Sequence, residues 1–308
     1  MIGDLQGKVA FITGSAGGIG LGMARAFAEA GMKIAMADVD AEALEQAASD
    51  LEASGATVLA VPLDVTDPAG WAAAAEKVQA ALGPVQLLCN NAGVSTLGLK
   101  FGQITPELWT KVVDTNVNGA FNGIRCFLEP MVAAGGGHIV NTASMGGLFG
   151  GIPDLTAYTA TKFALVGLSE SLRAELAVDG LVGVSVVCPG GVRSRLWRTS
   201  LRARGVADAD AVPSSAGGQS ASPDGMDPYE VGLRTVDAVH NNELYVITHP
   251  EFRAAIVYRH DQLMAACDHG EAVGAELHPN PDENGTARLD GTLLVETLTG
   301  GNPKPPAL

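Results

Sequence analysis

The stretch TGSAGGIG, Thr13 to Gly20, lies between a short apolar run, Val9–Ile12, and a segment of helical character, Leu21–Ala30. This order is that of a buried strand, a glycine-rich turn and the start of a helix. Glycines lack a Cβ atom, so the turn can be tight and a phosphate can approach the backbone. The free N–H groups at the helix start would attract that phosphate. On this motif alone, a plain strand–helix turn remains the alternative to a phosphate-binding loop.

Strand-like and helix-like segments alternate along the rest of the chain. The predicted strands are Lys8–Thr13, Lys33–Ala37, Thr57–Leu63, Val85–Cys89, His138–Thr142, Val182–Val187 and Glu243–Thr248. The predicted helices are Gly18–Ala30, Ala41–Ser54, Asp67–Leu82, Thr105–Ala133, Leu155–Val178, Pro228–His240 and Glu251–Ala266. Such alternation predicts an α/β fold, a Rossmann-type doubly wound parallel seven-stranded sheet with helices on both faces. We expect one domain over residues 1–267 and an acidic tail over residues 268–308, either flexible or at a subunit interface.

Composition excludes several classes of protein. The 308 residues carry a formal net charge of −15, which argues against binding nucleic acid or an anionic membrane, because both require positive surface. The four cysteines are scattered without a CxxC pair, as expected of reduced thiols in a cytoplasmic protein. The N-terminus, MIGDLQGKVAF, does not resemble a signal peptide, and no cluster of residues has metal-ligand spacing. We expect a cytoplasmic protein that binds no metal.

Asp38 closes the second predicted strand, about twenty residues after the glycine turn. A carboxylate there can accept hydrogen bonds from both hydroxyls of an adenosine ribose, and it repels a 2′-phosphate. A helix cap is the plain alternative, although Asp40 already serves that purpose. Neither Ser15 nor Val39 supplies the positive charge that a 2′-phosphate would need. The sequence therefore predicts NAD as the cofactor and disfavours NADP.

Small and polar residues follow the next two strands. Asp64-Val65 ends the third strand, and Asn90-Asn91-Ala92-Gly93 follows the fourth. The carboxyl ends of parallel strands share one edge of a sheet, so both groups are expected beside the glycine turn. There they would border the adenine and let the cofactor pass. Ordinary turn chemistry explains either motif alone.

Tyr158 and Lys162 form a YxxxK pair on one face of the helix Leu155–Val178, because they are four residues apart. A tyrosine that acts as a base near neutral pH needs its pKa lowered by roughly three units. A nearby ammonium group supplies part of that shift, since it favours the phenolate. A solvated Tyr–Lys pair is the plain alternative for this motif alone.

Two more polar residues are candidates for the same site. Ser144 lies just beyond the fifth strand, where its hydroxyl could hold a substrate oxygen beside Tyr158; a loop serine is the alternative. Asn116 lies mid-helix in TNVNG, and asparagine is a poor helix former. A kink at Asn116 could hold a water that relays protons from Lys162. A tolerated buried asparagine explains the residue equally well.

Taken in this order, TGxxxGIG, the acid after the second strand, NNAG, the mid-helix Asn, the Ser, YxxxK and Pro-Gly resemble the short-chain dehydrogenase/reductase family. The resemblance is close from Leu5 to Gly191. It implies that Tyr158 is the general acid/base, that Ser144 holds the carbonyl or alkoxide oxygen, and that Asn116 positions a relay water. Lys162 would bind the ribose and lower the pKa of Tyr158.

The same resemblance implies a cofactor site and a substrate lid. The implied cofactor-binding residues are Gly14, Ser15, Gly18, Ile19, Gly20, Asp38, Asp64, Val65, Asn91, Ala92, Gly93, Tyr158, Lys162, Pro189, Gly190, Val192 and Ser194. Ser194 stands where the family usually has Thr and keeps the hydroxyl expected to meet the cofactor carboxamide. The lid would be residues 192–228, of which Gly205–Asp227 is expected to be a flexible loop.

The first helix of this lid is amphipathic. Trp197 and Leu201 share one face, which is expected to cover the substrate together with Ser144, Gly146 and Tyr158. The other face carries arginines, which are expected to face solvent rather than bind an acidic substrate or acyl carrier: Arg195, Arg198 and Arg202.

The segment Asp227–Ala266 resembles longer family members that oxidise bulky aryl secondary alcohols, such as the bacterial Cα-dehydrogenases of lignin-derived aryl ethers. The implied function is that of an NAD-dependent secondary-alcohol dehydrogenase or ketone reductase with a bulky, partly apolar small-molecule substrate. A 3-oxoacyl-thioester reductase and a non-catalytic nucleotide-binding protein are the alternatives. The resemblance also implies a homodimer or homotetramer.

Overall fold

The computed structural model describes residues 2–96, 98–194, 196–206 and 225–277. The chain divides into two compact units, Met1–Phe252 and Arg253–Leu308. The predictions made for Arg195, for most of the loop Gly205–Asp227 and for residues 278–308 lie outside the described residues.

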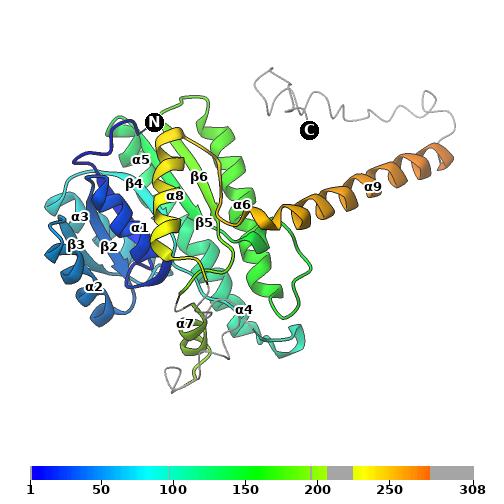
Figure 1. Ribbon diagram of the computed structural model, residues 1–308, viewed down its shortest axis with the longest axis horizontal. Helices are drawn as coiled ribbons and strands as arrows, with labels where there is room; N and C mark the ends of the chain where they lie inside the picture. The colour runs from blue at the N-terminus through cyan, green and yellow to red at the C-terminus, as the bar shows by residue number, and fades with distance from the viewer. Residues whose placement is uncertain (1, 97, 195, 207–224, 278–308) are drawn as a thin grey trace. The chain divides into compact units, whose positions relative to one another are not determined.

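Seven strands form one parallel sheet in the first unit (Figure 1). The sheet order is β3-β2-β1-β4-β5-β6-β7, and every neighbouring pair is parallel. The strands are β1 Val9–Thr13, β2 Lys33–Asp38, β3 Val58–Pro62, β4 Val85–Asn90, β5 Gly137–Thr142, β6 Val182–Cys188 and β7 Tyr245–Ile247. The order reverses between β1 and β4, and a ligand crevice opens at such a point in a doubly wound sheet. The predicted α/β fold is confirmed.

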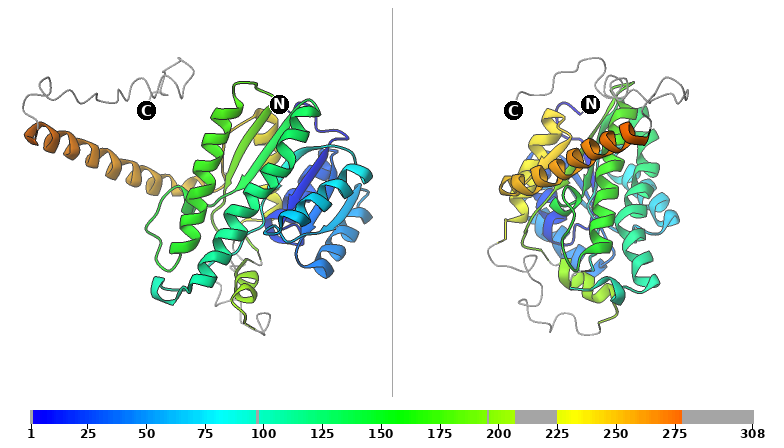
Figure 2. Two further views of the ribbon diagram at one scale, coloured as in Figure 1. Left: turned by 180° about the vertical axis from the view of Figure 1, so that it is seen from behind. Right: turned by 90° about the vertical axis from the view of Figure 1, so that its right-hand side faces the viewer.

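Helices cover both faces of this sheet, as the two opposite views of Figures 1 and 2 show. One face packs against α1 Gly18–Glu29, α2 Ala41–Ala53 and α8 Pro228–Asn241. The other packs against α3 Pro68–Ala81, α5 Gly119–Ala133 and α6 Thr156–Leu176. Alternate strand residues serve the two layers: Ala10 and Ile12 of β1 belong to the first core, Val9 and Phe11 to the second. The remaining short elements of this unit are α4 Pro106–Val113, α7 Leu196–Ala203, η1 Phe101–Gln103, η3 Met145–Gly147 and η5 Pro250–Phe252.

The helix predicted over Thr105–Ala133 is interrupted at its middle. A π-helical turn, η2 Asp114–Asn118, separates α4 from α5. Asn116 lies inside this turn and is buried. The irregularity expected at Asn116 is therefore present, in the form of a π turn, a form that is common at functional sites.

Two glycines let α1 and α8 cross with their backbones in contact. A Cβ atom on Gly22 would collide with the carbonyl oxygen of Pro228, and one on Gly232 with the carbonyl oxygen of Gly22. Side chains cannot be accommodated there without separating the helices. The helix that starts at the glycine turn is thus packed directly on α8.

The second unit begins with α9, Arg253–Leu277, which is longer than the helix predicted to end at Ala266. Alanine, glutamate and leucine in its last turns favour helix, although two glycines obscure the periodicity there. Its side chains from Val257 to Val273 are exposed. Among the described residues, no helix combines the length and the apolar character needed to cross a bilayer.

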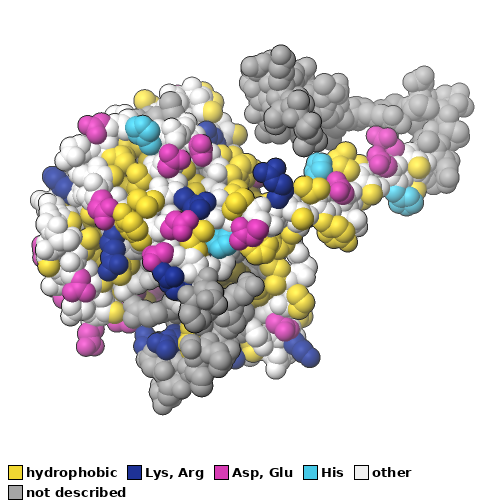
Figure 3. Space-filling view, viewed as in Figure 1, with side chains coloured by type: hydrophobic (Ala, Val, Ile, Leu, Met, Phe, Trp, Pro, Cys, Tyr) yellow, Lys and Arg dark blue, Asp and Glu magenta, His cyan; other side chains and the backbone are white. Residues whose placement is uncertain are grey.

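Acidic and basic side chains are interspersed on the face drawn in Figure 3. Within the described part of that face they form no continuous basic tract. Over the whole described part of the chain, no three His, Cys, Asp or Glu side chains gather as metal ligands would.

Candidate active site

A cavity of about 950 Å³ lies at the carboxyl ends of the strands and extends from the glycine turn to α7. Its volume is typical of small-molecule and cofactor pockets. It is lined by most of the residues predicted to bind the cofactor: Gly14, Gly18, Ile19, Asp38, Asp64, Val65, Asn91, Ala92, Gly93, Tyr158, Lys162, Pro189, Gly190, Val192 and Ser194. The structure therefore brings together side chains that are far apart in the sequence.

The glycine turn approaches other backbone segments closely. Gly14 has φ +66°, and a Cβ atom on it would lie 2.9 Å from the Cα of Ala92. Gly20 packs against the carbonyl oxygen of Gly14, so it shapes the turn without lining the cavity. Ser15 is fully buried and its hydroxyl donates to the carbonyl oxygen of Ala37, so it ties the turn to β2. This glycine cradle, which any Cβ would fill, fits the phosphates of a dinucleotide.

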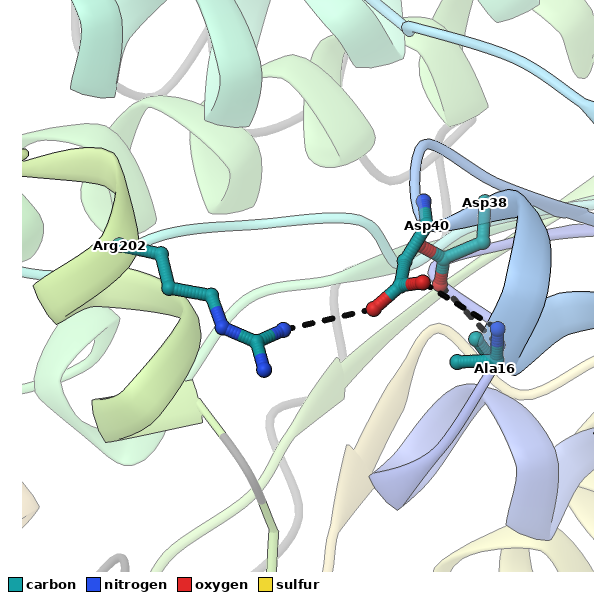
Figure 4. Close-up of polar contacts among 5 residues, drawn as sticks. Ala16, Asp38, Asp40 and Arg202 are labelled. Carbon is teal, nitrogen blue, oxygen red and sulfur yellow. Dashed lines mark hydrogen bonds and ion pairs between the residues drawn. The ribbon is translucent and has the colours of Figure 1, made fainter. Parts of the chain in front are cut away.

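Asp38 stands at the end of β2 with its carboxylate at the cavity (Figure 4). One oxygen accepts from the backbone N–H of Ala16 at 3.0 Å, and the other accepts from that of Asp40 at 3.1 Å. Asp40 caps α2 by accepting from the N–H of Ala43, and it also pairs with Arg202 of α7. The adenosine end of the predicted cofactor site thus carries two carboxylates and one guanidinium.

Hydrogen bonds join the ends of β1, β4 and β5. The hydroxyl of Thr13 accepts from the backbone N–H groups of Asn91 and Ala92. The side-chain amide of Asn91 donates to the backbone carbonyl oxygen of Thr13, and the side-chain amide of Asn90 donates to the side-chain oxygen Oδ1 of Asn141. These bonds fix the floor of the cavity, because they hold neighbouring strand ends at one level.

Tyr158 and Lys162 lie together on α6. The ammonium of Lys162 is 5.4 Å from the centre of the Tyr158 ring and donates to the carbonyl oxygen of Thr142 at 2.7 Å. Burial lowers the pKa of Lys162 from its ordinary value to about 8. Burial also raises the pKa of Tyr158 above its ordinary value, and the Ser144 hydroxyl, which donates to the phenolate, offsets this in part. The lowered pKa expected for Tyr158 is therefore not present in the protein alone, because desolvation outweighs the hydrogen bond from Ser144.

Ser144 and Asn116 approach this pair from two sides. The Ser144 hydroxyl accepts from the N–H of Gly146 and bonds to Tyr158, although neither Ser144 nor Gly146 lines the described cavity. The Asn116 amide accepts from the N–H of Val94 and donates to its carbonyl oxygen, 2.8 and 2.9 Å away. It also donates to the hydroxyl of Thr161. Asn116 therefore clamps the loop after β4 to α6, and its oxygen would lie only 3.2 Å from a Cβ on Gly93.

Helix α7 lines the cavity with residues other than Trp197 and Leu201, the two that were expected there. Trp197 is 5% exposed and, like Leu201, is not among the described residues that line the cavity. The cavity is lined instead by Leu196, Arg198, Thr199 and Arg202. The Ser200 hydroxyl accepts from the N–H of Ser95 at 2.8 Å, which fixes the helix with Arg198 and Arg202 at the cavity. Other lining residues that the sequence did not reveal come from the glycine turn, from α4 and from the π turn: Ala16, Gly17, Glu107, Thr110, Lys111, Asp114 and Thr115.

The comparisons with known proteins agree with this geometry. The family model for short chain dehydrogenases matches residues 8–205. The chain belongs to the short-chain dehydrogenase family. This short-chain dehydrogenase is 37% identical over 259 residues to the C alpha-dehydrogenase of Sphingobium sp. strain NBRC 103272 / SYK-6, which covers 82% of this chain and 84% of that protein.

Two solved structures extend the likeness. A short-chain dehydrogenase/reductase from Burkholderia phymatum in complex with NAD superimposes on this dehydrogenase with a TM-score of 0.79 and 33% identity, over 86% of this chain and 97% of that one. The 3-ketoacyl-(acyl-carrier-protein) reductase from Brucella melitensis complexed with NADH gives a TM-score of 0.67 and 28% identity, over 79% of this chain and 97% of that one. The dehydrogenase is thus an oxidoreductase with nicotinamide-binding relatives.

Proposed function

We propose that this dehydrogenase transfers a hydride between a secondary alcohol or ketone and NAD. The observation that carries the proposal is one continuous cavity, lined by Asp38 at one end and by Tyr158 and Lys162 at the other. A dinucleotide needs a site of this kind, with an acceptor for the adenosine ribose and a proton-transferring group beside the nicotinamide.

Tyr158 is the general acid/base of the proposed reaction. In the oxidation direction its phenolate takes the proton of the substrate hydroxyl, and in reduction its hydroxyl returns one. Ser144 holds the substrate oxygen next to Tyr158, Lys162 binds the ribose and stabilises the phenolate, and Asn116 fixes the loop along which a relay water lies. Bound NAD supplies the hydride acceptor and a cationic ring whose charge favours the phenolate.

NAD is preferred over NADP in this proposal. The carboxylates of Asp38 and Asp40 line the adenosine end of the cavity, and Arg202 already pairs with Asp40 at 3.3 Å. A 2′-phosphate would meet two negative charges there. Similarity to relatives solved with NAD and NADH supports the same choice.

The substrate class is proposed from the named relative. Similarity to the C alpha-dehydrogenase, at 37% identity, supports a bulky, partly aromatic alcohol or ketone. Similarity to the 3-ketoacyl reductase keeps a 3-oxoacyl-thioester reductase as the second candidate. We further propose a cytoplasmic homodimer or homotetramer.

The test is NADH formation from NAD with secondary alcohols that range from small aliphatic to aryl-ether compounds. Parallel assays replace NAD by NADP, or the alcohol by a 3-hydroxyacyl thioester. We expect turnover of the bulky aryl alcohols with NAD. Tyr158→Phe should lower kcat by about 10²- to 10⁴-fold without weakening NADH binding. The control is Tyr258→Phe, which alters an exposed tyrosine of α9. It should change neither kcat nor NADH binding. Thioester turnover would favour the second candidate, and full activity of Tyr158→Phe would refute the mechanism.

A further inference from the structure

Helix α7 spans the predicted cofactor site. Just before it, Ser194 lies over the glycine turn, since a Cβ on Gly18 would be 3.2 Å from the Cβ of Ser194. Near its end, the guanidinium of Arg202 lies 3.3 Å from a carboxylate oxygen of Asp40, next to Asp38 (Figure 4). The helical rise puts about 9 Å between Leu196, the first residue of α7, and Arg202. The helix therefore runs from the phosphate end of the site to the adenosine end.

Arg198 lies between these two points, one turn before Arg202 and on the same face. It lines the cavity, and its guanidinium stacks 5.2 Å from the centre of the Trp197 ring. Its Nε is buried and has no hydrogen-bond partner among the described residues. A buried donor without an acceptor is costly, so this geometry indicates that an anion completes the site.

Among the described residues, the other cations that line the cavity are Lys111 of α4, which is exposed, and Lys162 and Arg202, which have oxygen partners. Lys162 donates to the carbonyl oxygen of Thr142, and Arg202 pairs with Asp40. The start of α1 offers backbone N–H groups, but its first turn carries no basic side chain. A positive side chain beside the glycine turn would strengthen the binding of a diphosphate there, because a guanidinium binds phosphate through two parallel hydrogen bonds.

We propose that Arg198 binds the diphosphate of the cofactor, and that the Arg202–Asp40 ion pair holds α7 in the position that allows this. The inference rests on the proposed function in so far as a nicotinamide dinucleotide is the ligand. The rival occupant of Arg198 is an acidic group on the substrate. The two occupants differ in whether cofactor binding, measured without substrate, depends on Arg198.

The first experiment measures the Kd of NADH, ADP and adenosine by fluorescence and calorimetry. Arg198→Gln should weaken NADH and ADP by about tenfold or more and leave adenosine unchanged, because adenosine has no phosphate. Arg198→Lys keeps the positive charge but loses the two parallel N–H groups of the guanidinium. Its Kd values for NADH and ADP should lie between those of the wild type and Arg198→Gln. The matched control is Arg204→Gln, an exposed arginine at the end of the same helix that does not line the described cavity.

The second experiment measures the rate of NADH release by stopped flow. Asp40→Asn keeps a side chain that caps α2 but removes the charge, and Arg202→Gln removes the other partner. Each should speed release about two- to fivefold, as expected of an exposed ion pair. The double variant should release no faster than the faster single variant, because one interaction is lost in all three.

The outcomes separate the two proposals. Wild-type protein that does not bind NADH would overturn the proposed function and this inference with it. Wild-type protein that binds NADH, with an unchanged Kd in Arg198→Gln, would overturn only the inference and assign Arg198 to the substrate. Additive effects of Asp40→Asn and Arg202→Gln would refute the role of the ion pair.

Discussion

At the scale of single residues, the buried charge of Lys162 lowers the free energy of unfolding. Its side chain is 3% exposed, and its pKa is about 8 in the folded protein against 10.5 in the open chain. The unfolded state therefore binds more protons between these two values, and stability rises with pH in that window. Below about pH 8 the cost is roughly 3 kcal/mol.

Lys162→Met should therefore be more stable than the wild type at pH 7 and inactive. The gain should be about 2 kcal/mol, because the hydrogen bond to Thr142 is lost. Thermal unfolding from pH 7 to 10 checks this, and the difference should shrink above pH 8 as wild-type Lys162 loses its proton. A variant that is less stable than the wild type at pH 7 would contradict the expectation.

Most residues predicted to bind the cofactor do line the cavity, because strand ends and a glycine turn place them at one edge of the sheet. Arg198 and Arg202 could not be placed there. Their helix has two faces of opposite character, and amphipathicity alone assigns the apolar one inward. The contact between Ser200 and the N–H of Ser95, distant in sequence, decides the orientation instead.

At the scale of elements, the π turn depends on the amide of Asn116. This side chain is 1% exposed and satisfies both backbone polar groups of Val94. Asn116→Leu should destabilise the protein by about 2–4 kcal/mol, since it leaves these groups buried and unpaired. Denaturant unfolding measures the effect.

Asn118→Leu is the control for this change. Asn118 lies in the same turn and is exposed. Among the described residues, its side-chain amide donates only to the carboxylate of Asp114. Its replacement should change stability by less than about 0.5 kcal/mol. Equal losses in the two variants would mean that helix propensity, and not the bridge to Val94, governs the turn.

The sequence revealed a poor helix former at Asn116, but not the partners of its side chain. Val94 and Thr161 are distant in the sequence and are brought to Asn116 only by the fold.

At the scale of the whole molecule, the sheet interior sets a limit on acid stability. His138 of β5 is fully buried, and burial together with the charge of Arg173 lowers its pKa from 6.5 to about 3. The Ser185 hydroxyl donates to the carbonyl oxygen of Glu243, so it accepts from Nε2 of His138. A second proton would sit on Nδ1, which has no partner among the described residues.

Stability should therefore fall as the pH drops below 6.5, because the unfolded state binds the proton first. His138 accounts for about 3 kcal/mol of this loss between pH 7 and pH 4. In His138→Gln the loss over that range should be smaller by this amount. His240→Gln, at an exposed histidine of α8, should keep the wild-type slope. Denaturant unfolding at each pH checks both, and identical slopes in all three proteins would refute the assignment.

The crossing of α1 and α8 limits which residues the chain can carry at two positions outside the cavity. Gly22 and Gly232 do not line the described cavity, yet a Cβ atom at either position would collide with the backbone of the other helix. Because α1 begins at the glycine turn, such a collision would displace the turn that lines the cavity. A larger residue at either glycine should therefore disturb the glycine turn from outside the cavity, for a steric reason that no chemical motif reveals.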